Sequence, residues 1–357
     1  GATVLMDLRS GMANFAERCP ETMEATHAYF SPDNLFPPGK RFNSSVGHFR
    51  RLYGERLQKL VIDAGFTCPN RDGTVGVGGC SYCDNAAFHP NYSTPDMDIL
   101  TQLDEGISFH KVRYRNAGKY LAYFQAYSNT YGPIGRLKQV YTKALSHPEV
   151  VGIVIGTRPD FIDSEKLDLL EEISKEGIPG WEREGFPEPL VIIEYGIESC
   201  YDRTLLRINR GHDFACAERA VRMTAERGIE TGAHFILGLP GETPAMMREE
   251  CGRINSLPLT NIKFHQLQIV KGTKMEVEYS KNPEEFLRLS LDDYLDLVID
   301  ILERLRPDLY IERVAGEVPP RFVSETPWGL IRNDGILRLL DQRLEERDTC
   351  QGRLYRP

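Results

Sequence analysis

Short runs of aliphatic and aromatic residues recur along the chain, and between them lie longer segments in which the apolar positions follow helical spacing. Alternation of this kind is typical of βαβ units, whose strands form one parallel sheet. Six runs predict six strands, at residues 59–63, 120–125, 150–157, 190–196, 233–238 and 262–270. We therefore predict an α/β fold built as a partial (β/α)6 TIM-like barrel.

Two of the intervening segments show where their helices begin and end. In DFACAERAVRMTAERG, Asp213 is placed to cap the first turn and Gly228 to end the helix. In LSLDDYLDLVIDILERLRP, Ser290 and Asp293 resemble a capping box. The faces predicted to cover the sheet are Cys216, Ala220 and Met223 in the first helix and Leu295, Val298, Leu302 and Leu305 in the second.

The two ends of the chain lie outside this βα period. Residues 1–45 predict an irregular or partly helical N-terminal extension, with the dipeptide Pro37-Pro38 near its boundary. Residues 46–306 are the predicted barrel. Residues 307–357 contain the apolar run LYIERV and an amphipathic helix, and we expect this C-terminal strand and helix to pack on the barrel.

Composition is that of an ordinary globular protein, with 41% apolar residues, 27% charged residues and a net charge of −9. No stretch approaches the ~18 uncharged apolar residues of a membrane span. The N-terminal segment lacks the cationic start and apolar centre of a signal peptide, which predicts a cytoplasmic protein that does not associate with membranes. The net charge gives no overall attraction for nucleic acid.

Two local segments are nonetheless basic. KRFNSSVGHFRRLYGERLQK, at 40–59, carries six lysines and arginines, and KVRYRNAGK, at 111–119, carries four. Charged runs of this kind usually form a solvated face. Lysines and arginines are also the residues with which proteins contact RNA phosphates. RNA is therefore one candidate partner.

Polar and glycine-rich segments follow each predicted strand. Because the carboxyl ends of parallel strands meet at one end of an α/β barrel, we expect these segments to form a single rim. Any one of them is ordinary turn sequence, but six around one rim favour an active site. The residues concerned are Gln125, Ser128 and Asn129 with the second strand, Arg158 and Asp160 after the third, Glu194, Glu198 and Ser199 with the fourth, Gly238, Gly241 and Glu242 after the fifth, and Lys271 after the sixth.

The segment that follows the first strand is CPNRDGTVGVGGCSYC, which brings Cys68, Cys80 and Cys83 together in one loop. Thiolates suit zinc, copper(I) and iron–sulfur clusters, and zinc would need a fourth ligand. A redox C-x2-C pair is a further alternative, although it leaves the first cysteine without a role. The candidates for a fourth zinc ligand are His89, His48 and His110.

A 4Fe-4S cluster with three cysteine ligands would leave one iron open to another molecule, which is a catalytic arrangement. The glycines of the loop support this interpretation, because they let the backbone fold closely around an inorganic cube and point N–H groups at its sulfides. The glycines concerned are Gly73, Gly76, Gly78 and Gly79. A barrel enzyme with a metal centre at its rim is therefore the preferred interpretation.

With these motifs together, the chain resembles the radical S-adenosylmethionine (SAM) enzymes. Within them it resembles the uncharacterised bacterial group of the YhcC/YtqA type, which is related to the radical domain of the elongator catalytic subunit. The resemblance extends from about residue 41 to about residue 352 and rests on DAGFTCPNRDGTVGVGGCSYCDN, YFQAYSNTYGP, GIVIGTRPD, EYGIESCYDRTLLRINRGHD, HFILGLPGET, IKFHQLQIVKGT and LEERDTCQG. The eleven residues between Cys68 and Cys80 depart from the superfamily's common C-x3-C-x2-C motif, but similar long spacings occur in this group.

The resemblance implies a 4Fe-4S cluster on the three cysteines, SAM at its open iron, a 5′-deoxyadenosyl radical, and a reductase, flavodoxin or ferredoxin as electron donor. By motif position, the residues expected around SAM are Tyr82 beside the open iron, Gln125, Ser128 and Asn129 near the methionine amino group, Arg158 on the rim, Glu194 and Glu198 near the ribose, Arg210 at the methionine carboxylate, and Gly238 and Leu239 beside the adenine. The alternative for Glu194 and Arg210 is an ordinary ion pair.

Three hypotheses about function follow. The first is modification of a tRNA wobble uridine side chain, because relatives of the group act there, and it predicts that the basic segments converge on the rim. The second is a radical enzyme that acts on a small metabolite or a protein partner. The third is a non-catalytic zinc-binding interaction protein.

Overall fold

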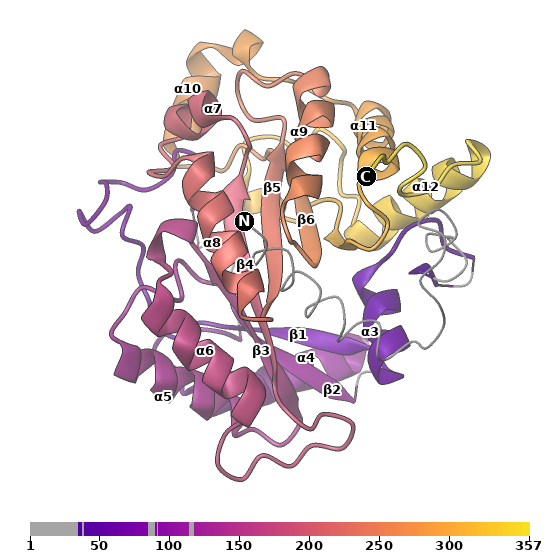
Figure 1. Ribbon diagram of the computed structural model, residues 1–357. Coiled ribbons are helices and arrows are strands. Elements are labelled where there is room, and N and C mark those ends of the chain that lie inside the picture. Colours follow the sequence, from indigo (N-terminus) through magenta and orange to yellow (C-terminus); the bar gives the residue numbers. More distant parts are fainter. Residues whose placement is uncertain (1–34, 38, 85–89, 91, 114–117) are drawn as a thin grey trace, which may run out of the picture.

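The computed structural model describes the chain from residue 35 to residue 357, except for residues 38, 85–89, 91 and 114–117. In this part of the chain, parallel strands in chain order form one seven-stranded sheet that curls into an open half-barrel (Figure 1). The predicted TIM-like α/β architecture is confirmed, and the predicted C-terminal strand in LYIERV joins the sheet as a seventh strand, because it pairs in parallel with the sixth. The strands are β1 (Leu57–Ile62), β2 (Lys119–Phe124), β3 (Val150–Thr157), β4 (Leu190–Glu198), β5 (Glu230–Leu237), β6 (Asn261–Gln266) and β7 (Tyr310–Arg313).

Helices connect the strands and cover the convex face of the sheet (Figure 1). Since each connection returns from the carboxyl end of one strand to the amino end of the next, the strands all end at the same rim. None of the described helices is long and apolar enough to cross a membrane. The helices are α3 (Ser45–Tyr53), α4 (Ile99–Arg113), α5 (Ile134–Leu145), α6 (Ser164–Glu176), α7 (Asp202–Arg207), α8 (Phe214–Glu226), α9 (Pro244–Ser256), α10 (Lys274–Lys281), α11 (Leu291–Arg304) and α12 (Asn333–Glu346).

The predicted runs overlap the strands but differ from them at the ends. β3 begins and ends where predicted. β4 continues to Glu198, and β5 begins already at Glu230. β6 ends at Gln266 rather than at residue 270, because Val270 instead forms an isolated antiparallel bridge with Val323.

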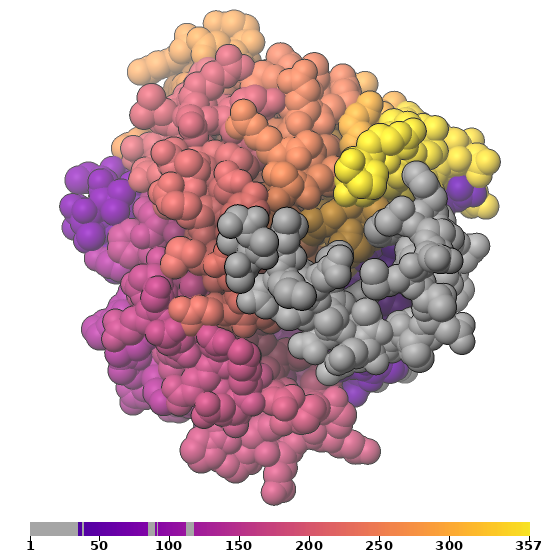
Figure 2. Space-filling view, viewed as in Figure 1, coloured from indigo at the N-terminus to yellow at the C-terminus, as the bar shows by residue number. Residues whose placement is uncertain are grey.

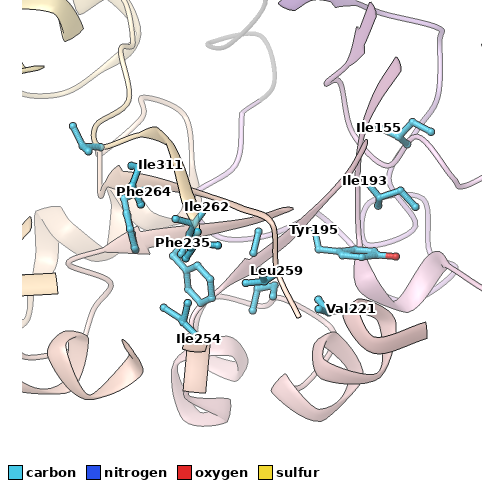
Figure 3. Packing of buried hydrophobic residues seen from close by; sticks show 14 of the residues in the cluster. Ile155, Ile193, Tyr195, Val221, Phe235, Ile254, Leu259, Ile262, Phe264 and Ile311 are labelled. Atoms are coloured by element: carbon cyan, nitrogen blue, oxygen red, sulfur yellow. The ribbon is translucent and has the colours of Figure 1, made fainter. Parts of the chain in front are cut away.

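The convex face of the sheet is apolar. Strand residues such as Ile193, Tyr195 and Phe235 pack against helix residues that include Val221 of α8 and Ile254 of α9 (Figure 3). Full burial of a large apolar side chain stabilises a fold by roughly 1.5–3 kcal/mol. This layer is the main hydrophobic contribution to folding, and it fixes where each strand ends.

The amino ends of α8 and α11 are as predicted. The Asp213 carboxylate accepts from the Cys216 N–H at 2.8 Å, and the Ser290 hydroxyl accepts from the Asp293 N–H at 3.1 Å. The predicted face of α11 is buried. In α8 the prediction is partly wrong: Ala220 is buried as predicted, but Cys216 and Met223 are only half-buried. The buried residues of α8 are Ala217, Ala220, Val221 and Thr224.

The two ends of the described chain meet beside β7. The Gln351 side chain accepts from the Asn43 N–H at 2.9 Å and donates to the Leu309 carbonyl at 2.8 Å. In α3, Phe49 makes an edge-on contact with Tyr310, the first residue of β7, at 5.7 Å between ring centroids. α3 therefore closes the end of the barrel opposite the rim. The division into extension, barrel and C-terminal segment remains a prediction.

The concave face of the sheet carries a buried ionic cluster. Glu194 of β4 accepts from Lys59 Nζ of β1 at 2.6 Å and from Lys263 Nζ of β6 at 2.7 Å. His234 of β5 contacts the same carboxylate at 3.0 Å, and Glu312 of β7 pairs with both lysines. Burial opposes the ionisation of Glu194, but Lys263 and Lys59 outweigh it and hold the pKa of this carboxyl well below its usual range. Opposite charges thus balance inside the barrel.

A second buried acidic group lies between the end of β4 and α9. The Ser199 hydroxyl donates to Glu242 Oε1 at 2.5 Å, and the Cys200 N–H donates to Glu250 Oε1 at 2.6 Å. Burial, and next the neighbouring Glu242 carboxyl, raise the pKa of Glu250 to about 8. Burial also raises the pKa of Glu242. Both carboxyl groups therefore hold a proton more strongly than a carboxyl group in water.

Removal of one buried lysine tests the ionic cluster. Lys263→Met leaves the buried Glu194 carboxylate with Lys59 as its one remaining lysine partner. Breaking a buried ion pair costs about 3 kcal/mol or more. We expect the free energy of unfolding, measured by urea denaturation, to fall by about that amount. Lys138→Met breaks an exposed pair with Glu172 and should cost less than about 1 kcal/mol; equal effects of the two substitutions would contradict the cluster.

The pH dependence of stability tests the carboxyl pair. The folded chain keeps a proton on Glu250 up to about pH 8, whereas the unfolded chain loses it near the usual value of 4.5, so stability decreases as pH rises through this window. In Glu250→Gln this decrease should be smaller by at least about 1 kcal/mol between pH 5.5 and pH 8.5, since one pKa unit is about 1.4 kcal/mol. Glu249→Gln, at an exposed position of α9, is the control and should behave as the unmodified chain. Equal decreases in all three proteins would show that Glu250 is not protonated.

Candidate active site

The cysteine loop (68–83) follows β1 and protrudes at the rim, where its indigo-to-purple atoms form the left edge of Figure 2. The Gly79 N–H closes the loop by donating to the Asn70 carbonyl at 2.8 Å. Gly73 and Gly79 have φ angles of 95° and 78°, in the left-handed region that favours glycine. A side chain on Gly76 would collide with the Asn70 amide. The conformation of the loop therefore requires the glycines that the sequence places there.

A short segment between α7 and α8, the anchoring segment (208–210), holds the cysteine loop in place. The Asn70 side chain donates to the Asn209 carbonyl at 2.6 Å, and the Asn209 side chain donates back to the Gly79 carbonyl at 2.8 Å. The Ser81 N–H adds a third bond to the segment, at 2.9 Å. Two parts of the chain far apart in sequence thus form one unit.

The thiols of the loop are soft ligands, and N–H donors and a positive charge lie near one of them. Arg210 Nη1 lies 3.4 Å from Cys80 Sγ, and Asn70 Nδ2 lies 3.6 Å from the same sulfur. Burial, and next the Cys80 thiol, raise the pKa of Cys83 to about 11, and Cys68 contributes in the same direction. Three cysteines that influence one another, with N–H donors on one sulfur, are a donor set that fits an iron–sulfur cluster.

Backbone strain is concentrated around this loop. Tyr127 after β2, Glu198 at the end of β4 and Asn209 in the anchoring segment have φ angles of 62°, 75° and 54°, which non-glycine residues rarely adopt. Asparagine tolerates this region better than tyrosine or glutamate. Such residues cluster at functional sites, where surrounding contacts hold them in place.

Tyr82, Glu198 and Arg210, three of the predicted SAM contacts, lie together beside Cys80. Arg210 Nη2 donates to the Gly196 carbonyl and lies 3.7 Å from Glu198 Oε1. Burial, and next the Glu198 carboxylate and Cys80, raise the pKa of Tyr82 well above its usual value. Arg210 Nε is buried and has no hydrogen-bond partner among the described residues. Glu194 and Arg210 do not pair with each other: Glu194 pairs with Lys59 and Lys263, and Arg210 approaches Glu198.

Ser128 and Asn129 tie the loop after β2 to β3. Ser128 Oγ lies 3.0 Å from Thr157 Oγ1. Asn129 Nδ2 donates to the carbonyls of Phe124 and Gly156, at 3.0 and 2.8 Å. Asn129 Oδ1 is buried and has no partner in the described part of the chain, so this oxygen is the atom of the side chain that remains for a ligand.

The remaining predicted contacts also lie at the rim. Arg158 forms a two-bond ion pair with Asp160, at 2.9 and 2.7 Å, and its buried Nη1 has no partner within the described ranges. Gly238 has a φ of 90°, and the adjacent Leu239 is fully buried. Gln125 is half-buried, directly after β2. These positions agree with a common site, but their contact with SAM remains a prediction.

The polar residues Lys263, His234 and His265 inside the barrel were not predicted from the sequence. Lys263 Nζ donates to Tyr123 Oη at 3.2 Å, and the rings of His234 and His265 lie 5.6 Å apart. Burial, and next His234, hold the pKa of His265 well below its usual value, which keeps the ring neutral. The signal was present in IKFHQ, because a strand buried on both faces is normally apolar throughout and here alternate residues are polar.

The histidines considered for zinc do not complete a site with the cysteines. His48 stacks on Tyr310 at 4.1 Å, at the end of the barrel opposite the rim, so the prediction of a ligand is wrong for it. His110 lies in α4 and makes an edge-on contact with Tyr92 at 6.3 Å, and His89 lies outside the described residues. Within the described part of the chain, no three His, Cys, Asp or Glu side chains form a group that could hold a single metal ion.

The basic segment 40–59 does not face the rim. It contains α3, which closes the opposite end of the barrel. Lys40 and Arg41 pair with aspartates of the C-terminal segment, and Lys59 lies inside the barrel. The prediction that this segment converges on the rim is therefore wrong. The second basic segment, 111–119, lies partly outside the described residues.

Comparison with known proteins shows the family of the chain. The Radical SAM superfamily profile matches residues 68–252, and the Radical_SAM C-terminal domain profile matches residues 259–346. The uncharacterized protein YtqA of Bacillus subtilis is 34% identical over 331 residues, which cover 90% of this chain and 96% of that protein. The tRNA uridine(34) acetyltransferase of Dehalococcoides mccartyi is 24% identical over 209 residues, which cover 57% of this chain and 41% of that protein.

Among solved structures, the archaeal Methanocaldococcus infernus Elp3 with an N-terminal deletion has the same fold, with a TM-score of 0.61 and 13% identity over 83% of this chain and 64% of that one. The resemblance predicted from the motifs is confirmed. Membership in a superfamily of enzymes contradicts the hypothesis of a non-catalytic zinc-binding protein. The chain belongs to the radical SAM superfamily.

Proposed function

We propose that Cys68, Cys80 and Cys83 hold a 4Fe-4S cluster and that the rim around them holds SAM at the open iron. When bound, the cluster and SAM supply one-electron cleavage of SAM and a 5′-deoxyadenosyl radical that removes a hydrogen atom from the substrate. The observation that carries the proposal is the cysteine loop itself, fixed by the anchoring segment with Arg210 and Asn70 on the Cys80 sulfur. Superfamily membership supports it.

Unpartnered polar atoms near the loop support the SAM site. Arg158 Nη1, Arg210 Nε and Asn129 Oδ1 are buried without partners in the described part of the chain. Buried polar groups are costly unless they are hydrogen-bonded, so we expect these atoms to bind a ligand that carries both donors and acceptors. The carboxylate and amino groups of SAM would satisfy them, and Glu198 would accept from a ribose hydroxyl.

For the substrate, we propose a uridine of tRNA, modified on its side chain. The support is the likeness to a tRNA uridine(34) acetyltransferase over more than half of this chain. The His234 and His265 rings on the concave face are suited to hydrogen-bond the edge of an extruded base, and the exposed Tyr127 ring at the rim is suited to stack on one.

A small metabolite or a protein partner is the second candidate substrate. The observation that favours it is the position of the basic segment 40–59 at the end of the barrel opposite the cysteine loop. Proteins that bind tRNA usually present a basic surface around their active site. In either case an external one-electron carrier of the flavodoxin or ferredoxin class would reduce the cluster.

Production of 5′-deoxyadenosine tests the proposed chemistry. The anaerobically reconstituted chain, given dithionite and SAM, should release 5′-deoxyadenosine that is detected by liquid chromatography with mass spectrometry. Cys80→Ala should reduce the yield to background, because it removes one of the three cluster ligands. Cys216→Ala, a half-buried cysteine in α8, should leave the yield unchanged. No product from the unmodified chain, or an equal yield from Cys80→Ala, would contradict the assignment.

The same assay separates the two candidate substrates. A tRNA substrate predicts that bulk tRNA from a strain lacking the gene raises the yield of 5′-deoxyadenosine and gains a modified uridine, detected in its nucleoside digest. Bulk tRNA already modified in cells is the matched control. An unchanged yield and nucleoside profile with tRNA would favour the small metabolite or protein partner.

A further inference from the structure

The Arg210 guanidinium is buried directly against the thiol of Cys80. Nη1 lies 3.4 Å from Sγ, and both residues are 6% exposed. The pKa of Arg210 is well above its usual value; burial opposes this, and the neighbouring Tyr82, Cys80 and Glu198 outweigh it. A guanidinium remains charged under all conditions in which proteins fold. A permanent positive charge therefore lies beside one of the three cysteines.

The surroundings hold the guanidinium in this orientation. Nη2 donates to the Gly196 carbonyl of β4, and Glu198 approaches the same nitrogen to 3.7 Å. Asn70 Nδ2 approaches the Cys80 sulfur from a second direction, at 3.6 Å. Cys80 Sγ therefore has two N–H donors, one of them cationic, and both belong to the hydrogen-bonded unit of the cysteine loop and the anchoring segment.

The other arginines of the rim differ from Arg210 in this respect. The charge of Arg158 is neutralised by the two-bond pair with Asp160. Arg71 donates to the backbone carbonyl of Cys83 at 2.5 Å and also interacts with the Cys83 thiol, but it is half-buried, so that water screens its charge more strongly. Arg210 is deeply buried, and its carboxylate partner Glu198 lies 3.7 Å away, further than Asp160 lies from Arg158.

We propose that Arg210, assisted by Asn70, sets the reduction potential of the cluster by stabilising its reduced state through the Cys80 sulfur. This inference rests on the proposed function. Reduction transfers one electron from an external carrier, or from dithionite in vitro, to the cluster and neither forms nor breaks a bond at Cys80. The added negative charge is stabilised by a nearby cation and by N–H donors to the sulfur, which raises the potential. Arg210 thus affects the reduction potential indirectly, through the Cys80 sulfur.

A redox titration tests this role without relying on turnover. The chain is reconstituted anaerobically without SAM, poised with dithionite and mediators, and the reduced cluster is quantified by electron paramagnetic resonance. In Arg210→Gln, the ratio of reduced to oxidised cluster at a fixed poise should fall about tenfold, which corresponds to about 59 mV for a one-electron couple. Arg210→Lys should give a smaller decrease, because the charge remains but the planar donor geometry is lost.

Control variants separate this role from a structural one. Arg207→Gln removes an arginine of α7 that pairs with Glu278 and Glu285, and it should leave the potential unchanged. Asn70→Ala removes the second donor and should also lower the ratio, which provides a test if Arg210→Gln does not assemble a cluster. Potentials of Arg210→Lys and Asn70→Ala equal to that of the unmodified chain would overturn the inference and leave the proposed function standing. Failure of the unmodified chain to assemble a 4Fe-4S cluster would overturn both.

Discussion

The cysteine loop is long and rich in glycine, so it needs partners from elsewhere in the chain to hold one conformation. Those partners come from the anchoring segment, more than a hundred residues further along, where Asn209 and Asn70 exchange hydrogen bonds with the two backbones. A hydrogen bond contributes only about 1 kcal/mol net, but several in one place define a geometry. The positions of the three thiols, and the contact of Arg210 with one of them, depend on this junction.

The two faces of the sheet serve different purposes. The convex face packs apolar strand residues against the helices and stabilises the fold. The concave face carries Glu194, Lys59 and Lys263 in a buried cluster, with His234 and His265 nearby. Ionisable groups with strongly shifted pKa values often mark functional sites, so this part of the concave face is a candidate for chemistry, while Leu121, Val154 and Ile192 pack with Phe49 of α3 and contribute to folding.

Most of the fold followed from the sequence because local patterns determine it. The strand runs, the caps at Asp213 and Ser290, and the collection of polar loops at one rim depend on spacing along the chain, and the structure has them where predicted, apart from the ends of several strands. The seventh strand is only four residues long and gives little pattern of its own, so the sequence predicts it as part of a segment that packs on the barrel rather than as a strand of the sheet.

The site was only partly predictable, since its contacts join distant segments. Arg210 and Glu198 were found through motif position, but the contact of Arg210 with Cys80 required three-dimensional packing. Glu194 was expected near Glu198, yet it lies deeper in the barrel, where Lys263 and Lys59 of other strands pair with it in the ionic cluster. The sequence predicts one basic surface for segment 40–59, but the fold places Lys59 inside the barrel.

Mössbauer spectroscopy of the anaerobically reconstituted, iron-57-labelled chain tests the central claim most directly, because it resolves the iron sites of one cluster. Three cysteine ligands leave one of the four irons different from the others. A 4Fe-4S cluster with one open iron should give a spectrum in which one quarter of the iron signal shifts when SAM is added and the remainder does not. A spectrum that SAM leaves unchanged, or protein that binds zinc and no iron, would contradict it.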